Sequence, residues 1–154
     1  MTPQEYDAWR PGAIEGYAAE HADAGSRPAE TSLEQARKEF DELLPDGVDT
    51  PEHHLLVATD HGTRVGLLWL NIPPPPQRAA FVYDVEVDET LRGKGYGRAI
   101  MLAAEAYVRE RGSSSLRLHV FGSNTVARSL YESLGYATTN VMMAKRLSDP
   151  GADS

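Results

Sequence analysis

Arg92-Gly93-Lys94-Gly95-Tyr96-Gly97-Arg98 links an apolar, strand-like run, Ala79–Val87, to a strongly helical run, Ala99–Arg111. Glycine lets the backbone bend sharply and approach a ligand closely. The first N–H groups of a helix have no partner inside the helix, and the helix dipole adds partial positive charge at that end. Three basic side chains fall in this short run, although the net charge of the chain is −8. These features predict a site for a phosphate-bearing anion at the start of the helix.

Two common phosphate loops do not fit these residues. A Walker A loop needs Gly-x-x-x-x-Gly-Lys-Ser/Thr, and the chain contains no such run. A dinucleotide-binding loop reads Gly-x-Gly-x-x-Gly in a first βαβ unit, with an acidic residue further along. Here the glycines alternate as Gly93-x-Gly95-x-Gly97, they fall past the middle of the chain, and no acid lies at the expected strand end.

Length and composition limit the class of protein. We expect a single domain over residues 1–154, with a frayed tail at 148–154. The absence of cysteine excludes disulfides, thiolate metal sites and a cysteine nucleophile. No secretory signal is visible and no apolar run approaches the ~20 residues of a membrane span, so a cytoplasmic protein without a membrane partner is expected. The charge of −8 disfavours nucleic acid and is compatible with a cationic substrate.

Hydrophobic periodicity and turn residues predict an alternation of helices and strands. Pro11 and Gly12 are expected to interrupt the start of the first helix. Thr31-x-x-Glu34 is typical of a capping box at the start of the second, and Asn124 is a favoured N-cap for the last. The expected helices are Tyr6–Ala24, Thr31–Leu44, Ala99–Arg111 and Asn124–Leu134, and the expected strands are His54–Asp60, Arg64–Ile72, Ala79–Asp88, Ser115–Phe121 and Tyr136–Leu147.

The strand before the glycines carries the most informative polar residues. Regular alternation would place Phe81, Tyr83, Val85 and Val87 on one face and Val82, Asp84, Glu86 and Asp88 on the other. Carboxylates in an apolar strand that leads to a phosphate loop are candidates for a functional site. The alternative is a solvated face, which is typical of an edge strand.

Two motifs resemble those of the GNAT family of acetyl-CoA-dependent N-acetyltransferases. Arg92-x-x-Gly95-x-Gly97 resembles the family's pyrophosphate loop, Gln/Arg-x-x-Gly-x-Gly/Ala, which follows a strand and opens a helix. Asn124-x-x-Ala127-x-x-x-Tyr131-x-x-x-Gly135-Tyr136 resembles its second motif, and the motifs cover Phe81–Leu147 in the correct order. The resemblance implies an α/β fold with a mixed, mostly antiparallel central sheet, helices on both faces and a splayed pair of parallel strands.

The resemblance also implies roles for individual residues. Acetyl-CoA would lay its pantetheine arm between the splayed strands, paired with the backbone of Val85 and Val87, and Asn124 would contact the arm. Tyr131 would lie near the thioester sulfur. The pyrophosphate would be held at the loop formed by Arg92, Gly93, Lys94, Gly95, Tyr96, Gly97 and Arg98.

Acetyl transfer needs groups that these residues supply. An amine with a pKa of about 10 must lose a proton before it attacks, and Glu86, or else Asp84, is the expected base. The oxyanion that forms from the thioester carbonyl needs a donor such as the N–H of Val87. A tyrosine keeps its proton at neutral pH, so Tyr131 is the expected general acid for the departing thiolate. Alternatively, Asp84 and Glu86 bind a cationic substrate, and Tyr131 is a core aromatic.

The sequence thus predicts an acetyl-CoA-dependent N-acetyltransferase whose acceptor is a primary amine of a small molecule or a protein. The alternative is an acyl-CoA-binding sensor without turnover, and a third hypothesis is a nucleotide-binding protein of another kind. No cluster of Asp, Glu and His has the spacing of a metal site, so no metal is expected. Many proteins of this fold dimerise, and the resemblance therefore implies a possible homodimer.

Overall fold

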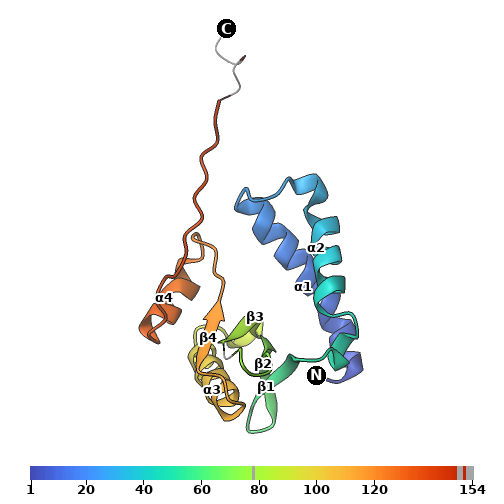
Figure 1. Ribbon diagram of the computed structural model, residues 1–154, viewed down its shortest axis with the longest axis vertical. Coiled ribbons are helices and arrows are strands. Elements are labelled where there is room, and N and C mark those ends of the chain that lie inside the picture. Colours follow the sequence, from blue (N-terminus) through green and yellow to red (C-terminus); the bar gives the residue numbers. More distant parts are fainter. Residues whose placement is uncertain (78, 149–150, 152–154) are drawn as a thin grey trace.

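A four-stranded sheet lies at the centre of the computed structural model, which describes residues 1–77, 79–148 and 151 (Figure 1). In both chain order and sheet order its strands are β1 (His53–Asp60), β2 (Thr63–Asn71), β3 (Ala79–Val87) and β4 (Ser115–Leu118). β1, β2 and β3 pair antiparallel, whereas β3 and β4 pair parallel. This sheet is mixed and mostly antiparallel, which confirms the predicted fold class.

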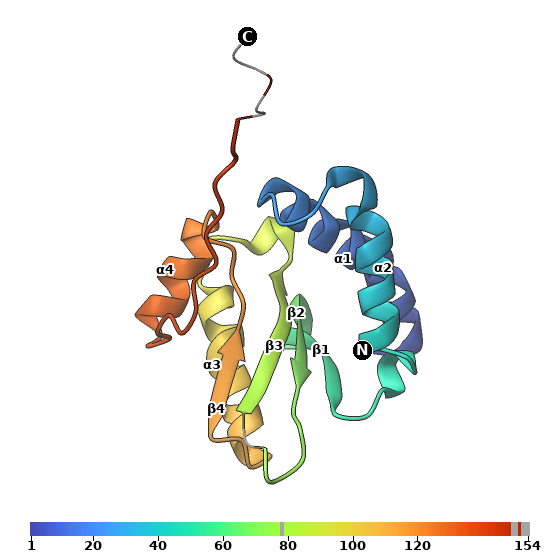
Figure 2. The same ribbon diagram turned by 45° about the horizontal axis from the view of Figure 1, so that its top comes forward.

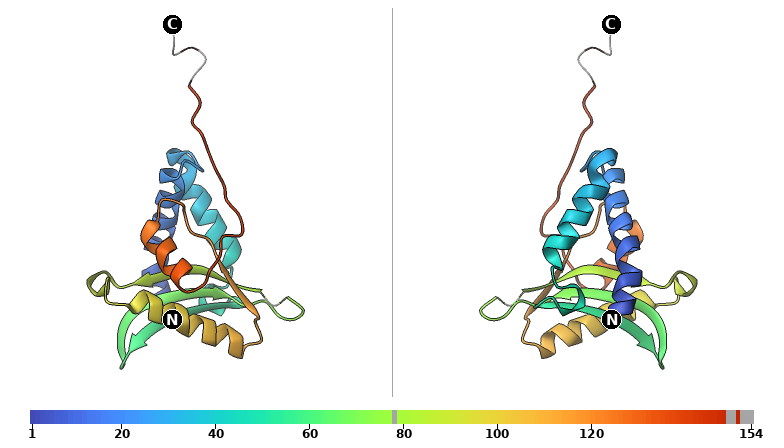
Figure 3. Two further views of the ribbon diagram at one scale, coloured as in Figure 1. Left: turned by 90° about the vertical axis from the view of Figure 1, so that its left-hand side faces the viewer. Right: turned by 90° about the vertical axis from the view of Figure 1, so that its right-hand side faces the viewer.

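Helices cover both faces of the sheet. α1 (Pro3–Asp23) and α2 (Ala29–Leu43) lie side by side on one face, and α3 (Tyr96–Glu110) lies on the other, as Figure 3 shows. α4 (Thr125–Ser133) lies beside α3 (Figure 2). Two short 3-10 helices, η1 (Gly47–Asp49) and η2 (Glu89–Leu91), lie in the connections.

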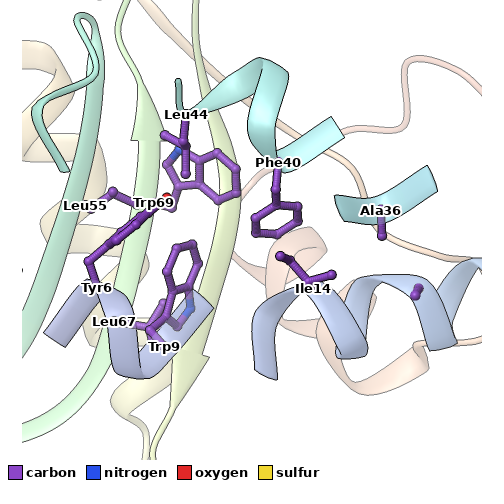
Figure 4. Packing of buried hydrophobic residues seen from close by; sticks show 10 residues of the cluster. Tyr6, Trp9, Ile14, Ala36, Phe40, Leu44, Leu55, Leu67 and Trp69 are labelled. Atoms are coloured by element: carbon purple, nitrogen blue, oxygen red, sulfur yellow. The ribbon is translucent and has the colours of Figure 1, made fainter. Parts of the chain in front are cut away.

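Aromatic rings fill the core between the sheet and the two N-terminal helices (Figure 4). Trp69 of β2 is 2% exposed and meets Trp9 of α1 edge-on, with ring centroids 5.7 Å apart. Phe40 of α2 lies 5.3 Å from Trp69. Buried rings remove large apolar areas from water, and tilted pairs bring a positive ring edge to a negative ring face. This core holds α1 against the strands.

Aliphatic side chains form a second core between the sheet and α3. Leu70, Ala80 and Met101 are completely buried there. Gly66 of β2 permits the close approach of strand and helix, because a Cβ atom at that position would lie 2.1 Å from the carbonyl oxygen of Glu86 and 3.0 Å from Cδ1 of Ile100. The start of α3 is therefore fixed beside the end of β3.

The predicted interruption of the first helix is wrong. α1 begins at Pro3 and continues through Pro11. A proline inside a helix costs roughly 3 kcal/mol. Trp9 and Ile14, on either side of Pro11, are both buried in the aromatic core, and their packing outweighs that cost.

The predicted capping box of the second helix is also wrong. α2 begins at Ala29, so Thr31 lies inside the helix, and its hydroxyl is directed at the carbonyl of Pro28. The capping box in this chain starts α1 instead, where the Glu5 N–H donates to the Thr2 hydroxyl and the Thr2 N–H donates to the Glu5 carboxylate. Proline fixes the backbone before a helix, which is why α2 can begin without a side-chain cap.

Residues 136–148 form no helix or strand, so the predicted last strand, Tyr136–Leu147, is wrong. The first part of this segment lies beside the end of β4, where Ala137–Met142 and Leu118–Ser123 line one hollow, and the chain then points away from the body (Figures 1 and 3). A strand forms only where its backbone groups find a neighbour. β4 is likewise shorter than expected, ending at Leu118 rather than Phe121. Of the predicted tail, residues 148–154, only Ser148 and Gly151 lie among the described residues.

No described helix is long and apolar enough to cross a membrane.

Candidate active site

β3 contains a β-bulge that decides where its carboxylates point. Leu70 pairs with Val82 but Trp69 pairs with Asp84, so Tyr83 is the extra residue. Leu70 lies in the core beside α3, and Trp69 lies in the core beside α1 and α2. Because paired residues point to the same face of a sheet, Asp84 points toward α1 and α2, whereas Val82 points toward α3.

The predicted regular alternation along this strand is therefore wrong. Val82, Val85 and Val87 all pack in the core beside α3, although the sequence pattern separates Val82 from the other two. Tyr83 stacks on Trp69 on the opposite face, with ring centroids 4.7 Å apart. One extra residue shifts the alternation, and hydrophobic periodicity alone does not reveal the shift.

β3 and β4 separate half-way along β3. Their parallel pairing joins Ala79–Val82 to Ser115–Leu118 and ends there. Beyond that point, among the described residues, Val85 and Val87 pair with a strand only on the β2 side. This is the separation of parallel strands that the family resemblance implies. A hollow of about 560 Å³ lies beyond the end of β4, and Tyr131 of α4 is part of its lining.

The glycine loop leaves the start of α3 open. Gly93 has φ +76° and Gly95 has φ +89°, values that other residues adopt only with strain. Gly95 is the N-cap of α3, and no side chain of a described residue caps the first N–H groups of that helix. A Cβ atom on Gly97 would lie 3.2 Å from Leu130, so glycine also permits α3 to pack closely on α4. The amide groups at this helix start are available to an anion.

The basic side chains of the loop differ in their partners. Arg92 donates from Nε to the carbonyl of Val87 at 3.3 Å, and Arg98 donates to the hydroxyl of Ser133 at 2.6 Å. The Tyr96 hydroxyl donates to Asp60 at 2.9 Å. Lys94 is exposed and makes no hydrogen bond or ion pair within the described part of the chain. Arg92 and Arg98 therefore help to hold the loop in place, whereas Lys94 is left to meet a ligand.

Asp84 lies in an environment that disfavours its charge. Burial and, to a smaller extent, the nearby charge of Glu86 raise its pKa to about 7, against a lowering effect of the indole N–H of Trp9. That indole N–H is buried and makes no hydrogen bond of ordinary length to a described residue, and its effect on the pKa of Asp84 is smaller than the effects of burial and Glu86. Burial also raises the pKa of Glu86, against the lowering effect of Arg92 and Arg64.

A third carboxylate, which sequence reasoning missed, joins these two. Glu20 of α1 has a raised pKa because of burial and the charge of Glu86, with His119 acting in the opposite direction. The face of α1 that meets β3 depends on how the aromatic core packs, and the sequence shows no signal for it. Three carboxylates from α1 and β3 thus influence one another beside the open edge of β3.

Tyr131 lies close enough to this group to sense its charge. Burial raises the pKa of Tyr131, and the charge of Asp84 raises it further. The ring packs near Tyr136, with centroids 6.0 Å apart. Asn124 caps α4, as predicted, by accepting a hydrogen bond from the Ala127 N–H at 3.2 Å. The fold therefore places Tyr131 within electrostatic range of Asp84, although the two residues are far apart in the sequence.

Comparison with known proteins agrees with this geometry. The family model of the acetyltransferase (GNAT) family matches residues 17–136. The chain belongs to the GNAT family. YdgE, an uncharacterized N-acetyltransferase of Bacillus subtilis, is 34% identical over 149 residues, which cover 96% of this chain and 95% of YdgE. A second uncharacterized N-acetyltransferase of Bacillus subtilis, YycN, is 37% identical over 96% of each chain. The crystal structure of YycN resembles this GNAT fold with a TM-score of 0.92, at 36% identity, over 97% of this chain and 96% of YycN.

Membership of the GNAT family makes this chain an acetyltransferase, and it implies acetyl-CoA as the co-substrate. The predicted family, fold and activity are confirmed. The roles of single residues in this GNAT site remain predictions, because the comparisons assign none. Among residues 1–77, 79–148 and 151, no group of three or more His, Asp or Glu is placed to hold a metal ion.

Proposed function

We propose that this GNAT enzyme moves the acetyl group of acetyl-CoA to a primary amine by direct attack of the amine on the thioester. One observation supports the proposal most strongly. The open edge of β3 has the uncapped start of α3 at one end and the carboxylates of Asp84 and Glu86 along its length. Such an edge fits an extended molecule with a diphosphate at one end and a reactive carbonyl at the other.

In this proposal the loop binds the diphosphate of acetyl-CoA. Backbone N–H groups from Gly93 to Arg98 donate to the phosphate oxygens, and Lys94 adds a positive charge. The pantetheine arm lies along the edge of β3 at Val85 and Val87. There it continues the strand pairing along β3 that β4 provides only as far as Leu118. The amide of Asn124 contacts the arm with its N–H₂ group, since its oxygen already caps α4.

The chemical step then follows from the groups along the edge. Glu86, or else Asp84, takes one proton from the ammonium group of the acceptor. The neutral nitrogen forms a bond to the thioester carbon, and the Val87 N–H stabilises the resulting oxyanion. The C–S bond then breaks, Tyr131 gives its proton to the sulfur, and the second amine proton leaves to solvent. The raised pKa of Tyr131 ensures that it holds a proton before this step.

The acceptor in this proposal is cationic. Glu20, Asp84 and Glu86 together favour an ammonium group at the open edge, because an opposite charge nearby relieves their mutual repulsion. A neutral amine or an acidic acceptor gains nothing from them. Small diamines, polyamines and protein amino groups are therefore the first acceptors to test.

The experiment is a screen of amines and peptides with acetyl-CoA, in which release of the CoA thiol reports transfer. We expect turnover with at least one cationic amine. Tyr131→Phe should then lower kcat by roughly 10²-fold, the ordinary contribution of a general acid. The matched control is Tyr107→Phe, because Tyr107 lies on α3 and its hydroxyl meets His54 away from the site.

Two outcomes would contradict the proposal. If calorimetry shows binding of acetyl-CoA but no amine ever releases CoA, the chain is an acyl-CoA sensor. If ATP or NAD binds and acetyl-CoA does not, the loop serves another nucleotide. A cytoplasmic location, and the lack of nucleic acid, membrane or metal partners, stay predictions from the sequence.

A further inference from the structure

The aromatic core between the sheet and α1 contains a polar group without a partner among the described residues. The indole N–H of Trp9 makes no hydrogen bond of ordinary length there, although Trp9 is only 8% exposed. The second tryptophan of this core differs, because the Trp69 N–H donates to Nδ1 of His53 at 2.9 Å. Buried donors in folded proteins are nearly always paired, so the N–H of Trp9 needs an explanation.

Asp84 of β3 is the polar group beside this N–H. It pairs across the sheet with Trp69, and both point to the face that α1 and α2 cover. Trp9 packs edge-on against Trp69, with ring centroids 5.7 Å apart (Figure 4). The indole N–H is close enough to Asp84 to lower the pKa of its carboxyl group. The donor without a partner and the carboxylate therefore lie in one core, next to the ring of Trp69.

We propose that Trp9 is a positioning residue for acetyl transfer: its indole N–H completes a hydrogen bond to the Asp84 carboxylate when Asp84 is ionised. The bond holds Asp84 in the charged form that meets a cationic acceptor at the open edge of β3, so this inference rests on the proposed function. A carboxylate has two oxygen atoms, and a bond from Trp9 to one of them leaves the other for the acceptor.

The unpaired N–H makes the core respond to the charge of Asp84. A carboxylate accepts a stronger hydrogen bond than a neutral acid does, because it carries a full negative charge. A protonated Asp84 therefore leaves the Trp9 N–H poorly satisfied, whereas an ionised Asp84 satisfies it. A hydrogen bond that forms mainly in the ionised state favours that state. Since only an ionised carboxylate attracts or deprotonates an ammonium group, Trp9 offsets part of the cost of burying Asp84.

The other side chains that act on Asp84 disfavour its charge or carry none. The charges of Glu86 on β3 and Glu20 on α1 both raise the pKa of Asp84, while the next backbone N–H along β3 lowers it. Tyr131 on α4 keeps its proton at neutral pH, because burial and the charge of Asp84 raise its own pKa. Among these side chains, Trp9 is thus the one that favours a charged Asp84.

Titration of Asp84 by carbon-13 NMR of its carboxyl group tests the hydrogen bond without any acceptor. Asp84→Asn identifies the signal by removing it. Trp9→Phe removes the N–H group, and the midpoint of the Asp84 titration should then rise by about one pH unit, the effect of one hydrogen bond to a charged group. Replacement of Trp9 by benzothienylalanine, in which sulfur takes the place of the N–H, should give the same rise and keep the shape of the core.

Trp69→Phe is the matched control. It is the same change in the same core, but it removes an N–H group that already has His53 as its partner. It should move the Asp84 midpoint less than half as far as Trp9→Phe does. An unchanged or lower midpoint in the benzothienylalanine variant would overturn the proposed bond, and that variant still decides the matter if Trp9→Phe does not fold.

Rates of acetyl transfer to a cationic amine, from acidic to alkaline pH, test what the bond does. In the benzothienylalanine variant the acidic limb of kcat/KM should move to higher pH as far as the Asp84 midpoint does. If the midpoint moves but the limb does not, Trp9 holds a carboxylate that the reaction does not use, and its positioning role is wrong. If no amine is acetylated, the proposed function fails and the positioning role with it, whereas the NMR titration still decides whether Trp9 bonds to Asp84.

Discussion

Val82 and Asp84, two residues apart on β3, point to opposite faces of the sheet because Tyr83 forms a bulge between them. The bulge lets a strand that packs its valines against α3 present Asp84 on the other face. A bulge also bends a strand and increases its twist. Here it directly follows Val82, the last residue of β3 that pairs with β4. The bulge and the separation of the two parallel strands therefore occur at the same place.

Deletion of Tyr83 tests the importance of the bulge. Without the extra residue, Val82 and Asp84 become neighbours and pair regularly with Leu70 and Trp69 on their present faces. We expect the chain to fold, but the strand to straighten and acetyl transfer to fall by roughly 10²-fold, because small displacements of reacting groups cost about that much. Tyr83→Ala is the control, since it keeps the bulge and loses only the ring. Equal activity in the deletion variant and the parent would show that the bulge is not needed for acetyl transfer.

Asp84 should make the stability of the protein depend on pH. Since burial raises its pKa to about 7, the folded chain binds a proton there from about pH 4 to about pH 7 that the unfolded chain does not bind. The contribution of Asp84 to stability is therefore lost as the pH rises through that window. Asp84→Asn should raise the free energy of unfolding at pH 8 by up to about 4 kcal/mol and change it little at pH 4.

Urea unfolding of parent and variant at the two pH values measures this difference. Asp7→Asn, an exposed change on α1, serves as the control and should stay within about 0.5 kcal/mol of the parent at both pH values. Destabilisation by Asp84→Asn at pH 8 would mean that the carboxylate makes net favourable contacts in the folded protein.

Glu86→Gln distinguishes a base from a binding group. If Glu86 takes the proton from the acceptor, the variant should lose kcat by roughly 10²-fold at pH 7 and recover most of it near pH 10, where the amine loses its proton without help. If Glu86 only attracts a cation, KM for the amine should rise and the loss should not recover with pH. Steady-state rates across that pH range, with acetyl-CoA saturating, separate the two cases.

Gly95→Ala tests the glycine loop. A Cβ atom at Gly95 has free space around it, so the substitution acts through its φ of +89° alone. The strain costs about 1–2 kcal/mol, and we expect the loop to shift and KM for acetyl-CoA to rise roughly tenfold. Gly62→Ala is the matched control, because Gly62 has a similar φ of +83° in the turn between β1 and β2. If both variants lose similar thermal stability but KM for acetyl-CoA rises only in Gly95→Ala, the glycine loop binds acetyl-CoA. An unchanged KM in Gly95→Ala would contradict that role.

The glycine loop and the Asn124–Tyr136 motif were sufficient to predict the family and the fold class, because both depend on residue types at fixed spacing along the chain. The N-cap role of Asn124 and the opening at the start of α3 are local in the same way. The capping box at Thr31 failed because Pro28 starts α2 earlier than the pattern indicates. A capping pattern predicts the first residue of a helix correctly only where no earlier residue starts that helix.

The sequence by itself determined where the glycine-rich, uncapped helix start lies and which strand leads to it, since the glycines, the basic residues and the helix start are consecutive. Only the tertiary structure decided which faces the carboxylates use, that Glu20 joins them, and that Tyr131 senses the charge of Asp84. It also decided that the last predicted strand pairs with no strand among the described residues. Each of these depends on contacts between distant segments, and hydrophobic periodicity records whether a side chain is buried but not which neighbour buries it.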